Sequence, residues 1–246
     1  MKISIVIPAY NEENRIKPTL ESYYGFFTKK KNEGILDFEI IVVINGTTDK
    51  TSKVVRQLQE SMPQLFLLEI SQSGKGLAIQ HGFGNALSRA NDIIGFVDAD
   101  MATSASEFYK LIQNINGYDG IIASRYMKES IVMPARPFIK RWGSKLFFGS
   151  LVRLLFNIRY YDTQCGAKLF TTMVIKKILP YLQERQWAFD VELLYVARRF
   201  GFSIKELPTR WNDQAGSKLQ IFRAGSRMLS GLMRMRWYYW RIKLNN

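Results

Sequence analysis

Short apolar runs, each followed by a polar loop, are the feature of this sequence that most restricts its fold. Five of them lie in the first half of the chain, at residues 3–8, 38–44, 65–70, 93–97 and 119–123. They are apolar without alternation, which is typical of strands buried on both faces. Segments with helical spacing separate them. The pattern therefore predicts an α/β fold, with a mostly parallel sheet flanked by helices on both faces.

The second half of the chain is less regular. Its expected elements are a long apolar and basic helix at about 137–157, a strand at 168–170, helices near 173–183 and 189–200, a strand at 203–207, and a final helix. Because no internal repeat or low-complexity linker interrupts the chain, we expect one domain over residues 1–218. A basic, aromatic-rich amphipathic segment at 219–246 follows it.

Three helices of the first half have local sequence support. Leu20, Tyr24 and Phe27 recur at helical spacing before the KKKNEG break. Thr51 is expected to cap the helix after the second apolar run. Ser104, followed three residues later by a glutamate, predicts a capping box at a later helix.

Cysteine and histidine are each present once. A single cysteine, Cys165, excludes an intramolecular disulfide and fits a reducing compartment. His81 would have to serve alone in any histidine-based metal cluster or Ser-His-Asp triad, so we expect it to be structural, and Cys165 to be a packed residue. The N-terminal residues lack the regions of a signal peptide, and no apolar stretch reaches the roughly 18 residues of a membrane-spanning helix.

The net charge of +14 is concentrated in two segments. Residues 136–161 and 219–246 each hold six basic side chains and no acidic one, which leaves 23 of the 35 basic residues against 21 acidic ones. Both segments are also rich in Phe, Leu, Met, Trp and Tyr. This combination favours an anionic membrane surface over nucleic acid as a partner. The alternative is a basic core helix with a solvated tail.

The last segment would be amphipathic as a helix. One face would carry Phe222, Leu229, Met233, Trp237 and Trp240, with Arg223, Arg227, Arg234 and Arg241 beside it. Apolar anchors flanked by arginines suit a helix that lies in a membrane interface. An amphipathic helix packed on the domain is the alternative.

Ligands of an open parallel sheet bind at the carboxyl ends of its strands. Four polar or glycine-rich loops lie at such ends, at residues 8–12, 45–49, 73–76 and 98–100. Asp98 and Asp100 can reach a divalent cation and a ribose hydroxyl, although two solvated acids would give the same pattern. Gly74-Lys75-Gly76 offers a helix N-terminus and an ammonium group to a phosphate, or is simply a turn.

Several longer motifs resemble glycosyltransferase family 2. In the first half these are IVIPAYNEE, GKGLAIQHG and the DAD after the fourth strand. In the second half YDTQCGAKLF, WAFDVELLYVARRFG and WNDQAGSK are similar to the dolichyl-phosphate β-glucosyltransferases and their bacterial polyprenyl-phosphate relatives. The resemblance covers about residues 3–220, and the second-half motifs are more specific than DAD.

The resemblance implies a GT-A fold, a UDP-sugar donor with UDP-glucose foremost, Mg²⁺ or Mn²⁺, and inversion at the sugar carbon. It implies nucleotide-sugar contacts from Pro8, Tyr10, Glu12, Lys75, Asp98, Ser217 and Lys218, to which we add Asn45. It implies metal ligation by Asp98 and Asp100, and catalytic roles for Asp162, Gln164 and Asp190. Asp162 and Gln164 would face the reacting sugar, with Trp187, Asp190 and Glu192 behind them. Arg125 matches an arginine near the acceptor phosphate, and we add Arg136 and Lys140 as candidate cations there.

The chain departs from the family pattern at the loop after the second strand. Two aspartates followed by Gly-Ser are usual there, whereas this chain has Asn45-Gly46-Thr47, with Asp49 and Thr51 retained. The Asn45 amide still offers one donor group and one acceptor to a base.

Direct displacement at the sugar carbon by a lipid-linked phosphate is the reaction that these features favour. The partners would be a nucleotide-sugar donor, a lipid-phosphate acceptor and a membrane surface, without nucleic acid, and the location would be peripheral on the cytoplasmic face. Some relatives of this family continue into membrane-spanning helices, and a membrane-protein partner could replace those anchors here. A homo-oligomer is a further candidate assembly. Three alternatives remain: a GDP-mannose-dependent polyprenyl-phosphate mannosyltransferase, a family 2 enzyme with a hydroxyl acceptor (polysaccharide or lipid), and an inactive membrane-binding scaffold.

Overall fold

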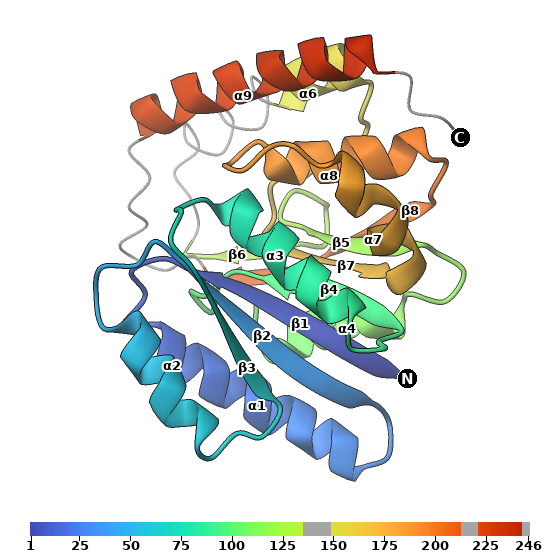
Figure 1. The fold of residues 1–246 in the computed structure, drawn as a ribbon. Helices are drawn as coiled ribbons and strands as arrows, with labels where there is room; N and C mark the ends of the chain where they lie inside the picture. The colour runs from blue at the N-terminus through green and yellow to red at the C-terminus, as the bar shows by residue number, and fades with distance from the viewer. Residues whose placement is uncertain (135–148, 213–220, 243–246) are drawn as a thin grey trace.

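A seven-stranded sheet forms the centre of the molecule in the computed structural model, which describes residues 1–134, 149–212 and 221–242 (Figure 1). The strands follow the order β3-β2-β1-β4-β7-β5-β8 across the sheet. Their bounds are β1 Lys2–Ala9, β2 Asp37–Asn45, β3 Leu65–Ile70, β4 Ile93–Val97, β5 Gly120–Ser124, β7 Ala167–Thr171 and β8 Ile204–Pro208. Each of the seven apolar runs predicted as a strand is one of these strands.

One strand, β7, runs against its neighbours. It pairs antiparallel with β4 and β5, whereas the other adjacent strands of this sheet pair in parallel. The prediction of a mostly parallel sheet is therefore confirmed. Because β7 is reversed, its first residues lie at the edge where β4 and β5 end. This reversal brings the 162–166 loop to the same edge as the predicted ligand loops.

Helices cover both faces of the sheet, as predicted (Figure 1). The helices α1 Ile16–Asn32, α2 Thr51–Gln59 and α4 Ala105–Gln113 lie on one face, and α3 Lys75–Leu87, α7 Thr172–Ile178 and α8 Phe189–Arg199 on the other. Successive β1 residues serve the two cores: Ile5 and Ile7 pack with α1 and α4, while Val6 packs with α3. A strand buried on both sides needs apolar residues at every position, which explains the unbroken runs.

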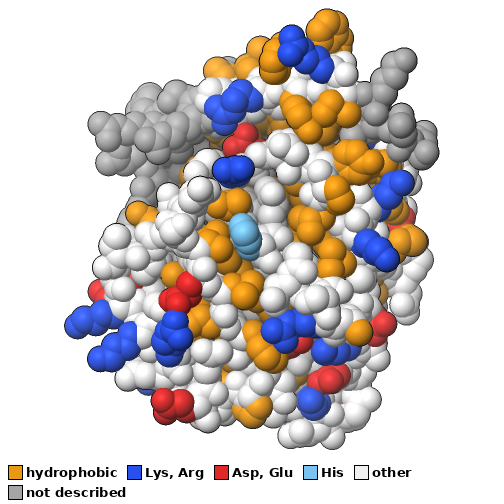
Figure 2. Space-filling model, in the orientation of Figure 1, with side chains coloured by type: hydrophobic (Ala, Val, Ile, Leu, Met, Phe, Trp, Pro, Cys, Tyr) orange, Lys and Arg blue, Asp and Glu red, His pale blue; other side chains and the backbone are white. Residues whose placement is uncertain are grey.

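The final helix, α9 Ile221–Arg241, lies across one end of the domain beside α6 Gly149–Phe156 (Figure 1). Leu232, Met235 and Tyr239 of α9 are buried in the core on the α3 side of the sheet. The opposite stripe is exposed and contains Leu229, Met233, Trp237 and Trp240. Hydrophobic and basic side chains gather over this end of the molecule in Figure 2. The helix thus packs on the domain and still presents four of the five predicted apolar residues outward. The side chains of Phe222, Arg223 and Arg227, also predicted there, lie outside the described ones.

No helix in the described parts of the chain combines the length and the apolarity needed to cross a bilayer. Of the long helix expected at about 137–157, the described residues show α6, and positions 137–148 lie outside them. The predicted helix near 173–183 ends at Ile178 and gives way to a short 3-10 turn, Leu179–Tyr181, which contains a proline. A proline has no amide hydrogen to continue the α-helical ladder.

Two elements were missed. Strands β6 Ile131–Met133 and β9 Arg210–Asn212 form a separate two-stranded parallel sheet. Three residues are too few to display a recognisable period, so only the folded chain reveals this pairing.

The capping predictions were partly wrong. Thr51 does not cap α2; the Asp49 carboxylate instead accepts the Thr51 amide hydrogen at 2.9 Å. At α4 the Ser104 hydroxyl does accept the Glu107 amide, at 3.3 Å. The Glu107 carboxylate, however, accepts the amide of Arg210 at 3.0 Å and so joins α4 to β9 instead of completing a capping box.

The single histidine and the single cysteine lie in different environments. His81 is exposed on α3 and appears as the pale-blue side chain in Figure 2. Cys165 is fully buried, and burial raises the pKa of its thiol to about 12. A thiol with such a pKa stays protonated at neutral pH, which fits the predicted packing role.

Candidate active site

Lys75 is the centre of the polar cluster at the carboxyl edge of the sheet. As the first residue of α3, it places its Nζ 2.8 Å from Asp98 Oδ1 and 3.5 Å from Asp190 Oδ2. Burial alone would lower the pKa of Lys75, but the charges of Asp190 and Asp98 outweigh it and raise that pKa. The side chain is therefore a fixed cation at a helix N-terminus, where an anionic phosphate is favoured.

Gly76 allows this turn to pack closely. A Cβ atom there would lie 2.6 Å from Cβ of Phe189 and 2.7 Å from the carbonyl oxygen of Glu184. The segment before α8 also approaches the lysine, because Lys75 Nζ lies 6.0 Å from the centre of the Trp187 ring. The motifs GKG and WAFD, far apart in the sequence, thus form one side of the site.

Asp98 and Asp100 follow β4 as predicted and are held by different contacts. The Asp98 amide donates to the carbonyl oxygen of Gly166 at 3.0 Å. A Cβ at Gly166 would lie 1.8 Å from Asp98 Oδ2, so only glycine fits beside this carboxylate. Asp100 Oδ1 accepts the Ala102 amide at 3.0 Å, across Met101 with a left-handed φ of 60°. Backbone hydrogen bonds of this turn therefore fix the positions of Asp98 and Asp100.

These two aspartates fit a divalent cation. Burial and the charge of Asp98 raise the pKa of Asp100, as expected where negative charges lie close together without full compensation. Carboxylate oxygens are the ligands that Mg²⁺ and Mn²⁺ prefer. Within residues 1–134, 149–212 and 221–242 no group of three or more His, Cys, Asp or Glu could hold a metal ion. Donor phosphate oxygens or water would have to supply the other ligands.

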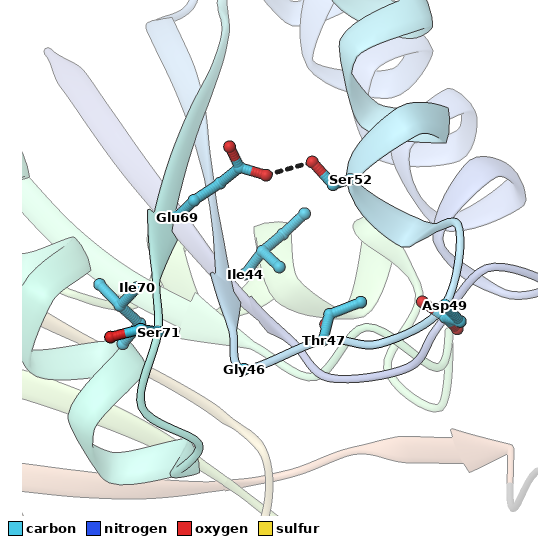
Figure 3. A pocket seen from close by; sticks show the side chains of 8 residues that line it. All are labelled: Ile44, Gly46, Thr47, Asp49, Ser52, Glu69, Ile70 and Ser71. Carbon is cyan, nitrogen blue, oxygen red and sulfur yellow. Dashed lines mark hydrogen bonds between the residues drawn. The ribbon is translucent and has the colours of Figure 1, made fainter.

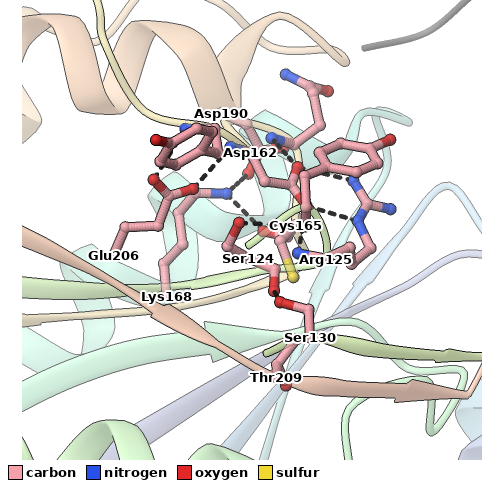
Figure 4. A network of polar contacts seen from close by, with 12 residues as sticks. Ser124, Arg125, Ser130, Asp162, Cys165, Lys168, Asp190, Glu206 and Thr209 are labelled. Carbon is pink, nitrogen blue, oxygen red and sulfur yellow. Dashed lines mark hydrogen bonds and ion pairs between the residues drawn. The ribbon is translucent and has the colours of Figure 1, made fainter. Parts of the chain in front are cut away.

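Arg125 and Asp162 form a second buried ion pair (Figure 4). The guanidinium donates to Asp162 from Nε at 2.7 Å and from Nη2 at 2.9 Å, and the Arg125 amide adds a bond of 3.0 Å. Burial would raise the pKa of Asp162, but Arg125 outweighs it and holds that pKa below its usual value. The pairing uses two of the five N–H donors of an arginine. A further contact to an acceptor phosphate therefore stays a prediction compatible with this geometry.

Gln164 carries a buried donor without a partner. Its side-chain Nε2 makes no hydrogen bond within the described parts of the chain, while its backbone amide donates to Asp162 Oδ1 at 3.1 Å. Leaving a buried amide donor unsatisfied costs about 1–3 kcal/mol. An oxygen of a bound sugar or phosphate would remove this cost, which supports the predicted position of Gln164 beside a ligand.

Lys168 belongs to the same cluster and was missed. The side chain is 0 % exposed, and its Nζ lies 2.6 Å from Asp190 Oδ1 and 2.6 Å from the Cys165 carbonyl oxygen (Figure 4). Burial would raise the pKa of Asp190, but Lys168 and Lys75 together lower it. A lysine within an otherwise apolar strand was the available signal, because a charge is buried there only when it is paired.

A pocket of about 370 Å³ lies between the ends of β2 and β3 (Figure 3). Its walls are formed by Ile44, Gly46, Thr47, Asp49, Ser52, Glu69, Ile70 and Ser71. The predicted base ligand Asn45 is next to it but only 3 % exposed. Its Oδ1 accepts the Gly74 amide and its Nδ2 donates to the Ala9 carbonyl, both at 3.0 Å. Direct binding of a base by Asn45 would require these bonds to be exchanged.

The loop after β1 is tied to the loop after β2. The Glu12 amide donates to the Thr51 hydroxyl at 2.8 Å, and the Asn11 carbonyl oxygen Oδ1 accepts the Thr48 amide at 2.9 Å. The Glu12 carboxylate pairs with Arg15 at 2.6 Å. Tyr10 is exposed between these contacts. The tie holds the loop that contains Tyr10 and Glu12 against the loop that lines the pocket.

The predicted site residues fall into three groups. Lys75, Asp98 and Asp190 are joined by ion pairs, which the missed Lys168 extends, and Asp100 follows Asp98 in the same loop. Arg125 and Asp162 form the neighbouring pair, with Gln164 bonded to Asp162, and Pro8, Tyr10, Glu12 and Asn45 lie at the ends of β1 and β2. Trp187 and Glu192 belong to the segment around α8. Arg136, Lys140, Ser217 and Lys218 lie outside the described residues.

A sugar nucleotide needs room for its base, a cation at its diphosphate and carboxylates for a metal, and one edge of this sheet offers all three. The protein is a nucleotide-sugar-dependent glycosyltransferase with a GT-A fold. It belongs to glycosyl transferase family 2, because the model of that family matches residues 4–179.

Proteins with similar sequences match nearly the whole chain. A dolichyl-phosphate beta-glucosyltransferase of Dictyostelium discoideum is 33% identical over 98% of this chain and 77% of its own length. A human protein of the same name is 32% identical over 98% of this chain and 78% of its own length.

Solved structures share the fold at lower identity. Glucosyl-3-phosphoglycerate synthase of Mycobacterium tuberculosis, crystallised with Mn²⁺, UDP and phosphoglyceric acid, has a TM-score of 0.69 and 18% identity, covering 96% of this chain and 78% of that one. The mannosyltransferase PcManGT of Pyrobaculum calidifontis, in complex with GDP-Man and Mn²⁺, has a TM-score of 0.62 and 15% identity, with coverage of 99% and 65%.

Proposed function

We propose that this protein transfers glucose from UDP-glucose to the phosphate of dolichyl phosphate, or of a related polyprenyl phosphate, with inversion at the sugar carbon. The observation that carries this proposal is the similarity to seven dolichyl-phosphate beta-glucosyltransferases. They are 32–35% identical over 89–98% of this chain. The paired cations and carboxylates at the carboxyl edge of the sheet support it.

The reaction is a single displacement. An oxygen of the acceptor phosphate forms a bond to C1 of glucose, and the bond from C1 to the UDP oxygen breaks, so that UDP leaves with the electron pair. A phosphomonoester has a second pKa of about 6 and is largely a dianion at neutral pH. The acceptor therefore has no proton to lose, and the site has to orient it and neutralise its charge.

Lys75 faces the donor diphosphate in this proposal. Its ammonium group, fixed by Asp98 and Asp190, opposes the charge that grows on the departing UDP. Asp98 and Asp100 would hold Mg²⁺ or Mn²⁺, which when bound supplies further positive charge at the diphosphate. Ser217 and Lys218 are proposed to close over the same group.

Arg125 and Asp162 act on the acceptor side. Asp162 fixes the guanidinium plane of Arg125, whose remaining donors would hold the acceptor phosphate together with Arg136 and Lys140. The unsatisfied amide of Gln164 is proposed to donate to an oxygen of the reacting sugar. Asp190 is proposed to orient groups from behind the sugar.

The 219–246 segment is proposed to bind the cytoplasmic face of a membrane, where the lipid acceptor resides. The outer stripe of α9 exposes Trp237 and Trp240 at 57 % and 73 %. The Arg241 guanidinium stacks 3.7 Å from the Trp237 ring centre, beside the same stripe. Apolar anchors with cations at their edge suit anionic headgroups.

A vesicle assay tests this membrane contact. The double variant Trp237→Ser/Trp240→Ser should lose most of its binding to vesicles of phosphatidylglycerol and phosphatidylcholine. Met173→Ser is the matched control, since Met173 is equally exposed, but on α7. Equal binding by the double variant and the control would refute the contact.

A product assay tests the reaction. The purified protein is incubated with Mg²⁺ or Mn²⁺, polyprenyl phosphate in detergent and a panel of UDP- and GDP-sugars, and lipid products are identified by mass spectrometry. Glucosyl phosphoryl polyprenol formed from UDP-glucose alone is the expected result. A mannosylated lipid formed from GDP-mannose would show that the donor is GDP-mannose instead of UDP-glucose. Slow hydrolysis of UDP-glucose without a lipid product would indicate an acceptor with a hydroxyl group instead of a phosphate.

A further inference from the structure

Lys168 is buried away from solvent and does not line the pocket. It nevertheless belongs to the cluster of charges that holds Lys75, the lysine proposed to face the donor diphosphate. Its Nζ binds Asp190 Oδ1 at 2.6 Å, while Lys75 approaches the other oxygen, Oδ2, at 3.5 Å. Lys75 in turn lies closer to Asp98, at 2.8 Å. The three contacts form a chain from the core of β7 to the end of β4.

We infer that Lys168 is a positioning residue for donor binding: by satisfying one oxygen of Asp190, it leaves Lys75 directed toward Asp98 and the donor diphosphate. The inference rests on the proposed function, because it assumes that Lys75 serves a nucleoside diphosphate. It also assigns Asp190 a positioning role that acts through Lys75.

Burial makes this contact decisive. Asp190 is 1 % exposed, so water cannot replace a lost ammonium partner. Without Lys168, the full charge of Asp190 would fall on Lys75, the nearest remaining cation. The Lys75 ammonium would then move toward Asp190 and away from Asp98, because the attraction between opposite charges rises steeply in a buried site. A phosphate at the α3 N-terminus would lose its partner.

Packing alone does not explain a lysine at this position. Residue 168 lies between apolar neighbours in β7 and is surrounded by a core that a methionine would fill without any desolvation cost. The Cys165 carbonyl oxygen, 2.6 Å away, orients the ammonium and fixes its distance from Asp190. The position therefore supplies charge at a defined point next to the site.

The test is calorimetric titration of the full chain with UDP and Mn²⁺. Lys168→Met keeps the volume and removes the charge, and we expect UDP binding to weaken about tenfold or more, the scale of one charge-assisted hydrogen bond. The KM for polyprenyl phosphate should change less than the UDP affinity, since Asp162 keeps its bonds to Arg125 and loses only the weaker influence of the Lys168 charge. Unchanged UDP affinity in folded Lys168→Met would overturn the inference.

A double variant that removes the charges of both Lys168 and Asp190 provides a second test. In Lys168→Met/Asp190→Asn no buried charge is left uncompensated, and Lys75 keeps Asp98 as its partner, so UDP affinity should return to within about threefold of the unmodified protein. A double variant as weak as Lys168→Met would mean that Asp190 acts on the donor directly, which refutes the inference. Should Lys168→Met fail to fold, Lys168→Gln keeps a polar group at this position without the charge, and UDP affinity equal to that of the unmodified protein would then overturn the inference.

Lys2→Met is the matched control. Lys2 also pairs with a buried carboxylate of the same sheet, Glu39, at 3.4 Å, but at the opposite end of the strands. Its loss should leave UDP affinity unchanged even where it lowers stability. If the unmodified protein binds no UDP, the proposed donor fails together with this inference; UDP binding that ignores Lys168 overturns the inference alone.

Discussion

The two acidic side chains after β4 have different partners. Asp98 pairs with Lys75 at 2.8 Å, whereas Asp100 accepts a backbone amide and has a raised pKa from burial and from Asp98. The negative charge of Asp100 is thus compensated less than that of Asp98. A divalent cation would therefore stabilise the Asp100 carboxylate most.

We therefore expect Asp100→Asn to lower turnover about a hundredfold or more without unfolding the protein. Product formation from UDP-glucose measures the activity, and circular dichroism checks the fold. Glu60→Gln, an exposed carboxylate after α2, serves as control. Near-normal turnover in Asp100→Asn would refute the metal assignment.

Gly166 offers a steric test of the Asp98 position. In Gly166→Ala the new methyl group would meet Asp98 Oδ2 at 1.8 Å, so the carboxylate must move, and we expect UDP binding and turnover to fall at least about tenfold. Gly25→Ala is the control, because nothing lies within 4 Å of its Cβ in the middle of α1. It should be slightly stabilising, by about 0.5–1 kcal/mol. Equal activity of the two variants would contradict the close approach.

At the scale of elements, α9 has two apolar faces with different roles. Leu232→Ala on the buried face should cost about 2–5 kcal/mol of unfolding free energy, because it opens a cavity in the core. Met233→Ala, one residue further on the exposed stripe, should change stability by less than about 0.5 kcal/mol. Denaturant unfolding measures both. A similar cost for the two variants would mean that α9 does not pack as described.

Glu192 links α8 to α9 and predicts a pH dependence. Its carboxylate accepts the Glu184 amide at 2.8 Å and lies 2.9 Å from the Tyr239 hydroxyl, while burial raises its pKa from 4.5 to about 7. Between these two values the folded state holds the proton more tightly than the unfolded state. The free energy of unfolding should therefore fall as pH rises from about 4.5 to about 7, by up to about 3 kcal/mol.

Glu192→Gln isolates this contribution. The variant cannot ionise at residue 192, so the difference in unfolding free energy between it and the unmodified protein should change with pH over that window and level off above it. Denaturant titrations at pH 5, 6, 7 and 8 measure the difference (values chosen to span the window about pH 7). A constant difference would show that Glu192 does not titrate there.

For the whole molecule, the placement of charge matters more than its sum. The net charge is +14, and the two basic segments hold nearly all of the excess. If the membrane contact combines apolar anchors with cations, binding to anionic vesicles should weaken but persist as salt rises from about 0.1 M to about 1 M, over which the Debye length falls from about 10 Å to about 3 Å. Complete release of the protein from the vesicles at about 1 M salt would mean that the exposed tryptophans do not contribute to binding.

Local sequence patterns were sufficient for most of the elements. The runs predicted as strands agree with β3 and β4 at both ends and with the other strands of the main sheet to within one residue. Burial on two faces demands unbroken apolar residues, so the signal lies within each segment. The same local reading found the turn of Lys75 and the aspartates after β4. It was wrong about Thr51, because this residue is already the first of α2 and its own amide donates to the Asp49 carboxylate.

Local sequence patterns could not predict which charged side chains of the site pair with one another. Arg125 and Asp162 are 37 residues apart, and the bonds between them follow from the reversed direction of β7. Lys168 looked like an exception in an apolar strand until Asp190 was brought beside it.

The amino-acid sequence by itself determined the seven strands of the main sheet, most of the helices, the expected edge of the site and the family, because periodicity, loop chemistry and motifs are carried by neighbouring residues. Only the tertiary structure decided which charges pair, which face of α9 is buried, and why Gly166 must lack a side chain. Those features depend on distances of a few ångströms between segments far apart in the chain, and they exist only after packing has fixed where each segment lies.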